Sequence, residues 1–331
     1  MKKELKIPSL EGKRVLVTGG CGFLGSNLAR RLVKDNSKVT LFVRPGKDKE
    51  NIKDFENKVD IIEGDILNLK DVETTIKDKD YIFHLAWQTD LKKSMLQPIE
   101  DLKTDCIGLL NILESCKIHN KNVKIIFAST TTVIGVTDKI PASENQGTNP
   151  LSIYEANKLL GEKYLYIYSK IHGLKTTVLR LSNVFGEGQK IDNPSRGVLN
   201  FMIGKTLRNE PLTVYGTGNF IRDYCYVQNY VDAFILAAAT ENTNGEAYVL
   251  GSGNGLTFNE MVEKIKRITE ELTGKKIEIT HIPWPDEDNP INKRNFIADY
   301  GKFNRATGWY PRISFEEGLM RTIEYYYKKI K

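Results

Sequence analysis

The sequence predicts an α/β protein, built as a doubly wound parallel sheet with a smaller C-terminal lobe. In the first half of the chain, short runs rich in Val and Ile alternate with longer segments whose apolar residues recur at three- and four-residue spacing. The short runs are almost continuously apolar, which is typical of parallel strands that helices cover on both faces. The chain has 331 residues, 40% of them hydrophobic, and can therefore bury a large core.

The expected elements follow one another in a regular order. We expect strands at 14–19, 38–43, 59–64, 81–86, 123–129 and 175–182. We expect amphipathic helices at 22–35, 69–78 and 107–120, and a longer helix at 151–171. Beyond residue 182, turns rich in Gly, Asn and Pro interrupt shorter elements. The sequence therefore predicts a larger domain at 1–182 and a smaller lobe at 183–331 that is interleaved with the sheet.

Composition argues against several classes of protein. Lys and Arg outnumber Asp and Glu by 48 to 42, but the charges are interspersed, so we expect no nucleic-acid partner. Cys21, Cys106, Cys116 and Cys225 show neither CxxC spacing nor pairing with histidines, so we expect no metal site and no disulfide. The N-terminus lacks an apolar secretory segment, and no run approaches the ~18 apolar residues of a membrane span. We therefore expect a cytoplasmic protein without a membrane partner.

A glycine-rich turn joins the first predicted strand to the first predicted helix. Gly19 allows a tight turn, Gly22 lets the backbone approach a pyrophosphate, and Gly25 permits close packing of helix on strand. The free N–H groups at the start of the helix favour a phosphate. The alternative is a turn without a ligand. We favour a dinucleotide site, which makes 1–182 a Rossmann-type domain.

The end of the second predicted strand bears on which dinucleotide is bound. NAD-binding domains usually place Asp or Glu there, whereas an Arg accommodates the 2′-phosphate of NADP. Here Val43 occupies that position and Arg44 follows. NAD and NADP both stay open, with NADP favoured unless Arg44 is an ordinary surface residue. Asp65, after the third predicted strand, is a candidate for the adenine or a cap of the next helix.

A tyrosine and a lysine lie four residues apart in the long predicted helix. Tyr154 and Lys158 share one face of that helix. A phenol ionises near pH ~10, so it serves as an acid–base group at neutral pH only beside a cation. Residues 129–132, at the end of the fifth predicted strand, offer hydroxyls for the oxygen of a reacting carbonyl. Alone, the Tyr–Lys spacing also occurs on solvated helix surfaces.

Together, several motifs carry a resemblance that covers essentially the whole chain. They are TGGCGFLGS (18–26), GDI (64–66), HLAW (84–87), ASTTTVIG (128–135), Tyr154 with Lys158, RLSNVFGEGQ (180–189), VYGTGNFIRDYCYVQNYVDAF (214–234), GSG (251–253) and ATGWYPRISFEEGL (306–319). In these motifs the sequence resembles the extended short-chain dehydrogenase/reductases, specifically the nucleotide-sugar epimerase/dehydratase group. The resemblance implies an enzyme whose partner is a nucleoside-diphosphate sugar.

The resemblance also implies roles for individual residues. Tyr154 would be the acid–base group, Lys158 its electrostatic partner, and Thr130 the hydroxyl that holds the sugar oxygen. The residues expected at the cofactor are Gly19, Gly22, Phe23, Leu24, Gly25, Arg44, Asp65, Ile66, Leu85, Ala86, Tyr154 and Lys158. The residues expected at the substrate are Trp87, Thr131, Asn183, Arg222 and Arg294. Two of these have structural alternatives, since Asn183 could cap a turn and Arg222 could pair with Asp223.

Departures from the family pattern narrow the expected reaction. Family dehydratases carry an Asp-Glu pair directly after the catalytic threonine, where this chain has Thr131 and Thr132. Hydroxyls do not replace a carboxylic acid and a carboxylate near neutral pH, so a 4,6-dehydratase is not expected. A 4-epimerase, which oxidises C4 of the sugar transiently, and an NADPH-dependent 4-keto-sugar reductase remain. We favour the epimerase for its overall similarity, although Arg44 favours the reductase. A cofactor-binding protein without activity would be expected to have lost Tyr154 or Lys158.

Two further expectations come from the resemblance. Many members of the family pair through two long helices, so we expect a homodimer through 95–118 and 151–171. Many epimerases also carry an Arg ten residues before the Asp that Asp299 matches, where this chain has Asn289. Lys293 or Arg294 would then make that contact, and 283–290 would be either part of a substrate lid or an inert turn.

Overall fold

The computed structural model describes residues 5–284 and 294–331. Among these residues, a parallel sheet of seven strands forms the centre of the larger domain, in the order β10-β6-β5-β4-β1-β2-β3. Its strands are β1 (Arg14–Thr18), β2 (Lys38–Val43), β3 (Asp60–Glu63), β4 (Tyr81–His84), β5 (Lys124–Thr130), β6 (Lys175–Leu181) and β10 (Glu246–Leu250). The fold class predicted from the sequence, a doubly wound parallel sheet, is therefore confirmed.

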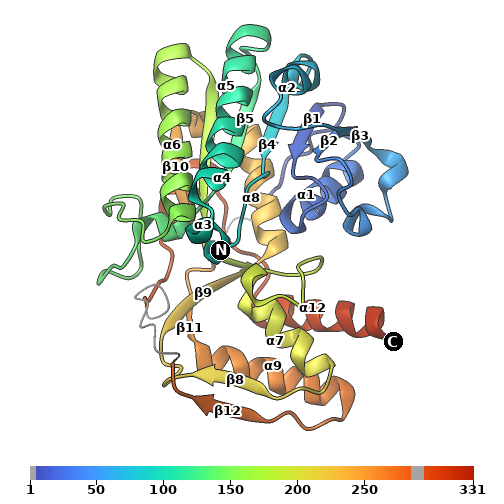
Figure 1. The fold of residues 1–331 in the computed structure, drawn as a ribbon, viewed down its shortest axis with the longest axis vertical. Coiled ribbons are helices and arrows are strands. Elements are labelled where there is room, and N and C mark those ends of the chain that lie inside the picture. Colours follow the sequence, from blue (N-terminus) through green and yellow to red (C-terminus); the bar gives the residue numbers. More distant parts are fainter. Residues whose placement is uncertain (1–4, 285–293) are drawn as a thin grey trace.

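Helices cover both faces of this sheet (Figure 1). One face carries α2 (Leu69–Ile76), α5 (Gly108–His119) and α6 (Ile153–His172), whose apolar sides share a buried cluster with the sheet. The opposite face carries α1 (Phe23–Lys34), α8 (Val227–Ala239) and α11 (Gly301–Thr307), which form a second buried cluster. Although α8 and β10 lie in the second half of the chain, both pack in the larger domain.

The smaller lobe lies below the carboxyl ends of the strands (Figure 1). The lobe consists mainly of β7 (Asn183–Phe185), α7 (Val198–Leu207), β8 (Leu212–Tyr215), β9 (Ile221–Tyr226), β11 (Gly255–Thr257), α9 (Phe258–Thr273), β12 (Ile279–Ile282) and α12 (Phe315–Ile330). β9 lies between β7 and β11, and β8 pairs with β12. α7, α9 and α12 bury the apolar core of this lobe.

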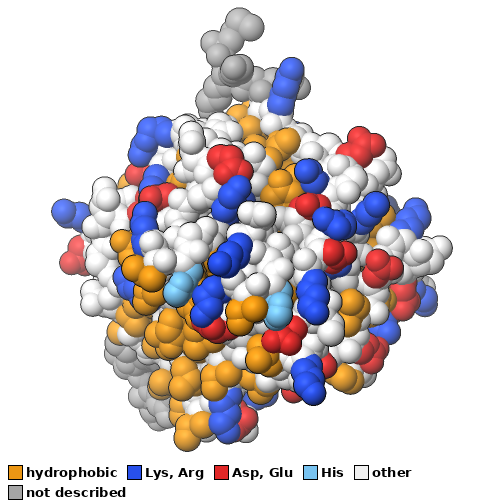
Figure 2. All heavy atoms as spheres, turned by 90° about the horizontal axis from the view of Figure 1, so that it is seen from above, with side chains coloured by type: hydrophobic (Ala, Val, Ile, Leu, Met, Phe, Trp, Pro, Cys, Tyr) orange, Lys and Arg blue, Asp and Glu red, His pale blue; other side chains and the backbone are white. Residues whose placement is uncertain are grey.

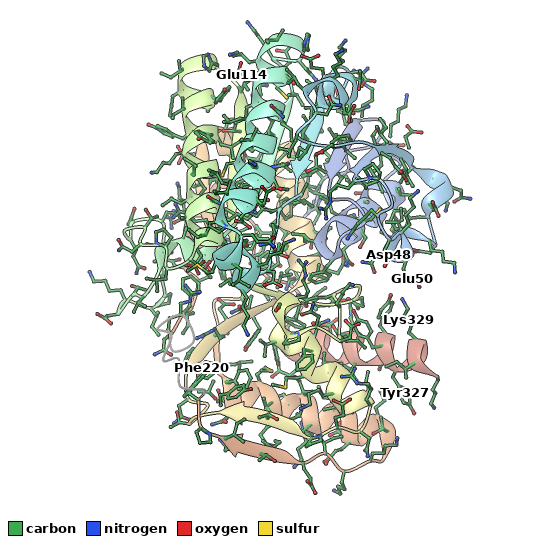
Figure 3. The ribbon with its side chains drawn as sticks, viewed as in Figure 1. Asp48, Glu50, Glu114, Phe220, Tyr327 and Lys329 are labelled. Atoms are coloured by element: carbon green, nitrogen blue, oxygen red, sulfur yellow. The ribbon has the colours of Figure 1, made fainter. Side chains whose placement is uncertain are left out.

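An ion pair joins the two lobes at one edge. Lys329 of α12 lies 3.0 Å from Glu50, at the start of the short helix η1 (Glu50–Ile52) that follows β2. Figure 3 shows these two side chains pointing toward one another between the lobes, with Asp48 beside them. The side chains of the pair are each about half exposed, at 45% and 51%, so the pair adds little stability. It marks where the larger domain meets the smaller lobe.

The helix that the sequence predicts at 107–120 has an additional N-terminal part. Before α5, the chain forms α3 (Leu91–Leu96), α4 (Pro98–Leu102) and a π-helical turn, η3 (Lys103–Ile107). The wider turn adds a residue to the helical path, and such turns frequently occur at functional sites. In the part of the chain that the structure describes, no helix combines the length and the apolar character that crossing a membrane requires.

Candidate functional site

A cavity of about 1390 Å³ lies between the carboxyl ends of the parallel strands and the smaller lobe. The larger domain lines it with the glycine turn after β1 and with residues that follow β2, β4 and β5. The smaller lobe lines it from β7, β8, β9 and the segment around α7. In doubly wound folds this edge of the sheet is where ligands bind. The cavity therefore brings elements far apart in the sequence to one site.

The glycine turn is shaped so that its backbone faces the cavity. Gly19 has a φ of +71°, and a Cβ there would lie 2.9 Å from the backbone nitrogen of Ala86. A Cβ on Gly25 would lie 2.4 Å from the carbonyl oxygen of Gly19, so neither position accepts a side chain. Gly22 is the N-cap of α1 and supplies no capping side chain, and Phe23 lines the cavity beside it. The turn and the helix start therefore fit a pyrophosphate group.

The second strand ends without a carboxylate. Val43 is buried at the end of β2, while Arg44 and Lys47 line the cavity. Glu63, the last residue of the neighbouring strand β3, is paired with Lys49 at 3.1 Å. Two cationic side chains are therefore available at this end of the cavity. An NAD-binding domain usually has a carboxylate at this place.

Asp65 was expected at the cofactor, but the structure places its carboxylate elsewhere. Its Oδ1 accepts a hydrogen bond from the backbone N–H of Leu67 at 3.0 Å, so it closes the turn before α2. Among the described residues, Gly64 and Ile66 line the cavity on either side of it, and Asp65 does not. Asp65 is not the cap of α2 either, because Asn68 is the N-cap of that helix and its side chain accepts the capping hydrogen bond. The Asp65 carboxylate instead binds the backbone of its own turn.

Thr130, Tyr154 and Lys158 line the same cavity, from the end of β5 and the first turns of α6. The Thr130 hydroxyl lies 2.9 Å from that of Thr132 and accepts a hydrogen bond from the Thr132 N–H. α6 begins at Ile153 because the Ser152 side chain caps it, which sets Tyr154 in the first turn. The structure therefore brings the expected acid–base group, its lysine and a hydroxyl together.

Burial dominates the electrostatics of Tyr154. Removal of the phenol from water raises its pKa, and the nearby carboxylates of Asp105, Glu155 and Asp101 raise it further. A phenol in these surroundings is uncharged at neutral pH. Ionisation of Tyr154 in the reaction would therefore depend on a neighbouring positive charge.

Lys158, the cation expected beside Tyr154, is held in a confined position. Its Nζ donates a hydrogen bond to the carbonyl oxygen of Ala128 at 2.6 Å. The same nitrogen lies 4.0 Å from the centre of the Trp87 ring and 4.6 Å from that of Phe127, within the range of cation–π attraction. Burial lowers the pKa of Lys158. Trp87 both lines the cavity and packs in the core cluster beneath α5 and α6.

Cationic and amide side chains line the cavity from the smaller lobe. Asn183, Arg222 and Arg294, all expected at the substrate, lie along it. One guanidinium nitrogen of Arg294, Nη2, donates to Oε1 of the buried Glu155 at 2.8 Å. The other nitrogen, Nη1, is buried and has no hydrogen-bond partner among the described residues. An anionic group of a ligand would satisfy it.

Thr131 was expected at the substrate and does not reach the cavity. It is 3% exposed, and Thr130 and Thr132 line the cavity in the described structure while Thr131 does not. The short helix η4 (Thr131–Ile134) begins directly after Thr130 and turns the Thr131 side chain into the protein. Two other positions discussed from the sequence, Asn289 and Lys293, lie outside the described residues, as does most of 283–290.

An aromatic group that the sequence reasoning missed lines the cavity in the smaller lobe. Tyr215 and Trp284 stack with ring centres 5.6 Å apart, and Phe220 lies 5.9 Å from Trp284. Tyr215 ends β8 and Trp284 follows β12, so the pairing of these two strands brings them together. Figure 3 shows Phe220 in the smaller lobe beside β9. Aromatic faces of this kind are suited to a planar base.

Comparison with known proteins connects this site to a family. The family model described as GDP-mannose 4,6 dehydratase matches residues 16–322. The chain belongs to the nucleotide-sugar epimerase and dehydratase family. The extended short-chain dehydrogenase/reductase assignment made from its motifs is thereby confirmed.

Relatives within this family carry out different reactions. A UDP-N-acetyl-alpha-D-glucosaminuronate decarboxylase from Bacillus cytotoxicus is 32% identical over 334 residues, covering 95% of this chain and 98% of the relative. The structure of a UDP-glucose 4-epimerase from Thermotoga maritima with UDP-glucose is 32% identical, with a TM-score of 0.87, and covers 96% of this chain and 100% of the other. A UDP-glucose 4-epimerase from Thermus thermophilus in complex with NAD is 28% identical, with a TM-score of 0.83, and covers 95% and 98% of the two chains. The comparisons therefore do not decide the exact reaction, which has to be inferred from the residues of this chain.

Proposed function

We propose that this chain is an NAD(P)-dependent nucleotide-sugar 4-epimerase that oxidises C4 of a nucleoside-diphosphate sugar transiently. The observation that carries the proposal is that Thr130, Tyr154 and Lys158 line one cavity with the glycine turn after β1. These three side chains can remove and return the proton of a sugar hydroxyl that lies next to a bound dinucleotide. The similarity to two UDP-glucose 4-epimerases over nearly the whole chain supports the same reaction.

The chain's own residues have separable tasks in this proposal. Thr130 and Tyr154 hold the oxygen at C4 by hydrogen bonds. Tyr154 takes the hydroxyl proton as a phenolate and later returns it as a phenol. The charge of Lys158 lowers the cost of the phenolate that forms on Tyr154. A bound dinucleotide, held by the glycine turn after β1, would supply the acceptor and donor of the C4 hydride. Inversion at C4 would follow when the sugar presents its opposite face before the ketone is reduced.

The smaller lobe would hold the nucleotide part of the substrate. Arg222 and the unpartnered Nη1 of Arg294 are cationic donors that fit diphosphate oxygens, and Asn183 adds an amide beside them. Tyr215 and Trp284 offer aromatic faces for the base. Recognition of the diphosphate and the base by this lobe leaves the sugar directed toward Tyr154.

The residues after Thr130 argue against elimination of water. Thr131 is buried outside the cavity lining, and Thr132 presents a hydroxyl next to Thr130. Neither can act as the carboxylic acid and carboxylate that a 4,6-dehydratase would need beside the threonine. We therefore favour epimerisation over dehydration.

One observation favours a second candidate, an NADPH-dependent nucleotide-4-keto-sugar reductase. Arg44 and Lys47 line the cavity after β2, and buried Val43 stands where an NAD-binding domain would have a carboxylate. A preference for NADP would suit an enzyme that delivers its hydride once. The reductase would use the same Thr130, Tyr154 and Lys158.

We also propose that the protein forms a homodimer through the outer face of α3 to α6. Large hydrophobic side chains are exposed on these elements: Met95, Leu96, Ile99, Leu102, Ile107, Ile118, Tyr166, Ile167 and Ile171. Figure 2 shows hydrophobic side chains gathered over one part of the surface seen from above. Apolar patches of this kind mark protein–protein contacts, and the same elements carry the dimer expected from the family resemblance.

The experiment that tests the proposed function follows inversion at C4 directly. Purified protein is denatured to identify any released dinucleotide by mass, and then incubated with UDP-, dTDP-, GDP- and CDP-hexoses. Chromatography and proton NMR detect the C4 epimer. Conversion without added reductant supports the epimerase, whereas stoichiometric consumption of NADPH with a 4-keto sugar establishes the reductase instead.

A matched pair of tyrosine variants tests the site assignment. Tyr154→Phe removes only the acid–base hydroxyl, so we expect kcat to fall by roughly 10²–10⁴-fold with dinucleotide binding retained. Tyr166→Phe changes an exposed tyrosine on the same helix and should leave kcat unchanged. A Tyr154→Phe enzyme with nearly full activity would mean that another group carries the proton.

A further inference from the structure

Two threonines at the end of β5 are joined by a pair of hydrogen bonds at the wall of the cavity. Thr130 is the last residue of β5, and Thr132 follows in the short helix η4. The Thr130 hydroxyl oxygen accepts a hydrogen bond from the backbone N–H of Thr132 at 3.2 Å, and the two hydroxyl oxygens lie 2.9 Å apart. Within the described part of the chain, both hydrogen bonds of the Thr130 hydroxyl are made to Thr132.

The turn itself does not require the hydroxyl of Thr132. Thr130 is the N-cap of η4, and this cap is complete once its oxygen accepts the Thr132 N–H. The turn ends at Gly135, where a φ of +78° and the nearby carbonyl oxygen of Asn149 exclude a side chain. Thr132 is partly exposed and lines the cavity, so a residue without a hydroxyl would also fit this position. The bond between the two hydroxyls therefore calls for an explanation other than the shape of the turn.

The reaction proposed above fixes the role that Thr130 must have toward the sugar. As a hydroxyl, the C4 oxygen gives its hydrogen to Tyr154, so toward Thr130 it can only accept a hydrogen bond. As a carbonyl, the same oxygen carries no hydrogen and again can only accept. In both states, therefore, Thr130 has to be the donor.

The contacts of Thr130 leave its hydrogen available in only one arrangement. A hydroxyl has one hydrogen and can accept two hydrogen bonds. The N–H of Thr132 takes one accepting position of Thr130. If the Thr132 hydroxyl donates across the 2.9 Å contact, it takes the other position, and the hydrogen of Thr130 remains for the cavity. If Thr130 donated to Thr132 instead, it would turn a lone pair toward the C4 oxygen.

We propose that Thr132 is a positioning residue, whose hydroxyl donates to Thr130 and thereby makes Thr130 a hydrogen-bond donor to the C4 oxygen. The proposal rests on the proposed function and deepens it, because it gives each hydrogen bond at the reacting oxygen a fixed direction. Thr132 acts through Thr130. The hydrogen bonds run from Thr132 to Thr130 and from Thr130 to the sugar, and aligned hydrogen bonds of this kind strengthen one another.

The residues next to Thr130 keep the pair in place. The hydroxyl of Ser129, the preceding residue, donates a hydrogen bond to the buried carboxylate of Glu162 on α6. Thr131, the following residue, is 3% exposed and turned into the protein. The chain is thus anchored on both sides of Thr130. A donor that is already in place costs no rearrangement when charge develops on the reacting oxygen.

Valine and serine variants test this role by kinetics. Thr132→Val keeps the branched shape and the backbone N–H and removes the donor to Thr130. We expect kcat to fall about tenfold, which corresponds to one ordinary hydrogen bond, with an unchanged Kd for the nucleoside diphosphate alone. Thr132→Ser restores the hydroxyl and should return kcat to nearly the wild-type value. Thr131→Val makes the same change one residue away, outside the cavity lining of the described structure, and should leave kcat unchanged.

A double-mutant cycle separates positioning from a general structural role. Thr130→Val removes the donor to the sugar, and loss of one such donor costs roughly 10²–10³-fold in kcat. In that background the Thr132 hydroxyl has nothing left to orient, so the double variant should be no slower than Thr130→Val. If Thr132→Val slows both backgrounds by the same factor, the two residues act independently and the proposal is overturned. Wild-type kcat in Thr132→Val also overturns it.

Neutron diffraction on crystals of the deuterated wild-type protein locates the two hydroxyl hydrogens directly. We expect a deuterium on Thr132 Oγ1 that is directed at Thr130, and the deuterium of Thr130 directed into the cavity. A deuterium of Thr130 directed at Thr132 overturns the proposal, even if the valine variants do not fold. This measurement uses no substrate, so an absence of epimerase activity contradicts the proposed function and leaves the neutron test intact.

Discussion

A buried ion pair fixes the helix that carries Tyr154 to the C-terminal part of the chain, and breaking it should destabilise the protein measurably. Arg294 Nη2 lies 2.8 Å from Glu155 Oε1, with side-chain exposures of 8% and 0%. The second Glu155 oxygen accepts a hydrogen bond from the Leu151 N–H at 2.7 Å. At this exposure, salt screens the pair weakly. We predict that Glu155→Gln leaves the Arg294 guanidinium buried without an anion.

The magnitude follows from the burial of both partners. Removing one partner of a buried ion pair costs about 3–5 kcal/mol of the free energy of unfolding. Because the amide oxygen of Gln keeps one acceptor, we expect the lower end of this range, about 3 kcal/mol. Near 60 °C the entropy of unfolding is about 2.1 cal/mol/K per residue, or roughly 0.7 kcal/mol/K for a chain of this length. The expected fall in Tm is therefore about 4 °C.

Differential scanning calorimetry on a double-mutant cycle measures this effect. Glu155→Gln, Arg294→Met and the double variant are compared with the wild type, and the double variant should lose less than the two single variants together. Glu100→Gln is the matched control, because its partner Lys103 and Glu100 itself are at least half exposed, so Tm should stay within about 1 °C. Strictly additive single effects, or a fall in Glu155→Gln no larger than in the control, would refute the reasoning.

Three further predictions concern the cofactor, a buried lysine and the oligomer. Arg44→Ser should weaken NADP(H) binding about tenfold or more with little change for NAD(H), since it removes a charged hydrogen-bond donor; calorimetric titration that finds both dinucleotides equally affected contradicts the NADP assignment. Burial lowers the pKa of Lys124 to about 8 from its ordinary 10.5, so between these values the unfolded chain binds more protons and the free energy of unfolding rises with pH. Urea unfolding across this pH range should show a smaller rise of the free energy of unfolding in Lys124→Met than in the wild type. Equal slopes of that free energy against pH would contradict the lowered pKa of Lys124. Ile99→Asp places a charge on a side chain that is 67% exposed on α4 and should convert the proposed dimer to monomer. An unaltered sedimentation coefficient excludes this face as the interface.

Local sequence signals predicted six of the seven strands of the central sheet, all but β10, and several of the residues that line the cavity. The strands were predictable because they are short apolar runs, and α6 because Ser152 caps its start and Gly173 its end. The tight turn at Gly19 and Gly25 was predictable because the glycines follow an apolar strand and open a helix, and the structure shows that neither position has room for a Cβ. Such features depend on residues close in the chain.

The rest of the site depends on contacts between distant segments. Asp105 reads as a polar helix residue, and its burial follows from the π-helical turn and from Gln88 on another element. Tyr215 and Trp284 meet because β8 pairs with β12, which no local pattern indicates. Spacing also could not show that Thr131 turns inward, because the direction of a side chain after a strand ends depends on the next turn.

The charged residues of α6 explain how the helix that carries Tyr154 is held in one orientation. Glu155, Lys158 and Glu162 are spaced by three and four residues, so they lie on one helix face, and all three are buried. Glu155 binds Arg294 from the C-terminal part of the chain, and Glu162 binds Arg180 of β6. Lys158, between them, donates to the carbonyl oxygen of Ala128 and faces the rings of Trp87 and Phe127. Apolar packing tolerates small rotations of a helix, whereas each buried charge here is satisfied only when it meets its own partner. Rotation of α6 would expose three charges to apolar surroundings at once, and this requirement keeps Tyr154 directed at the cavity.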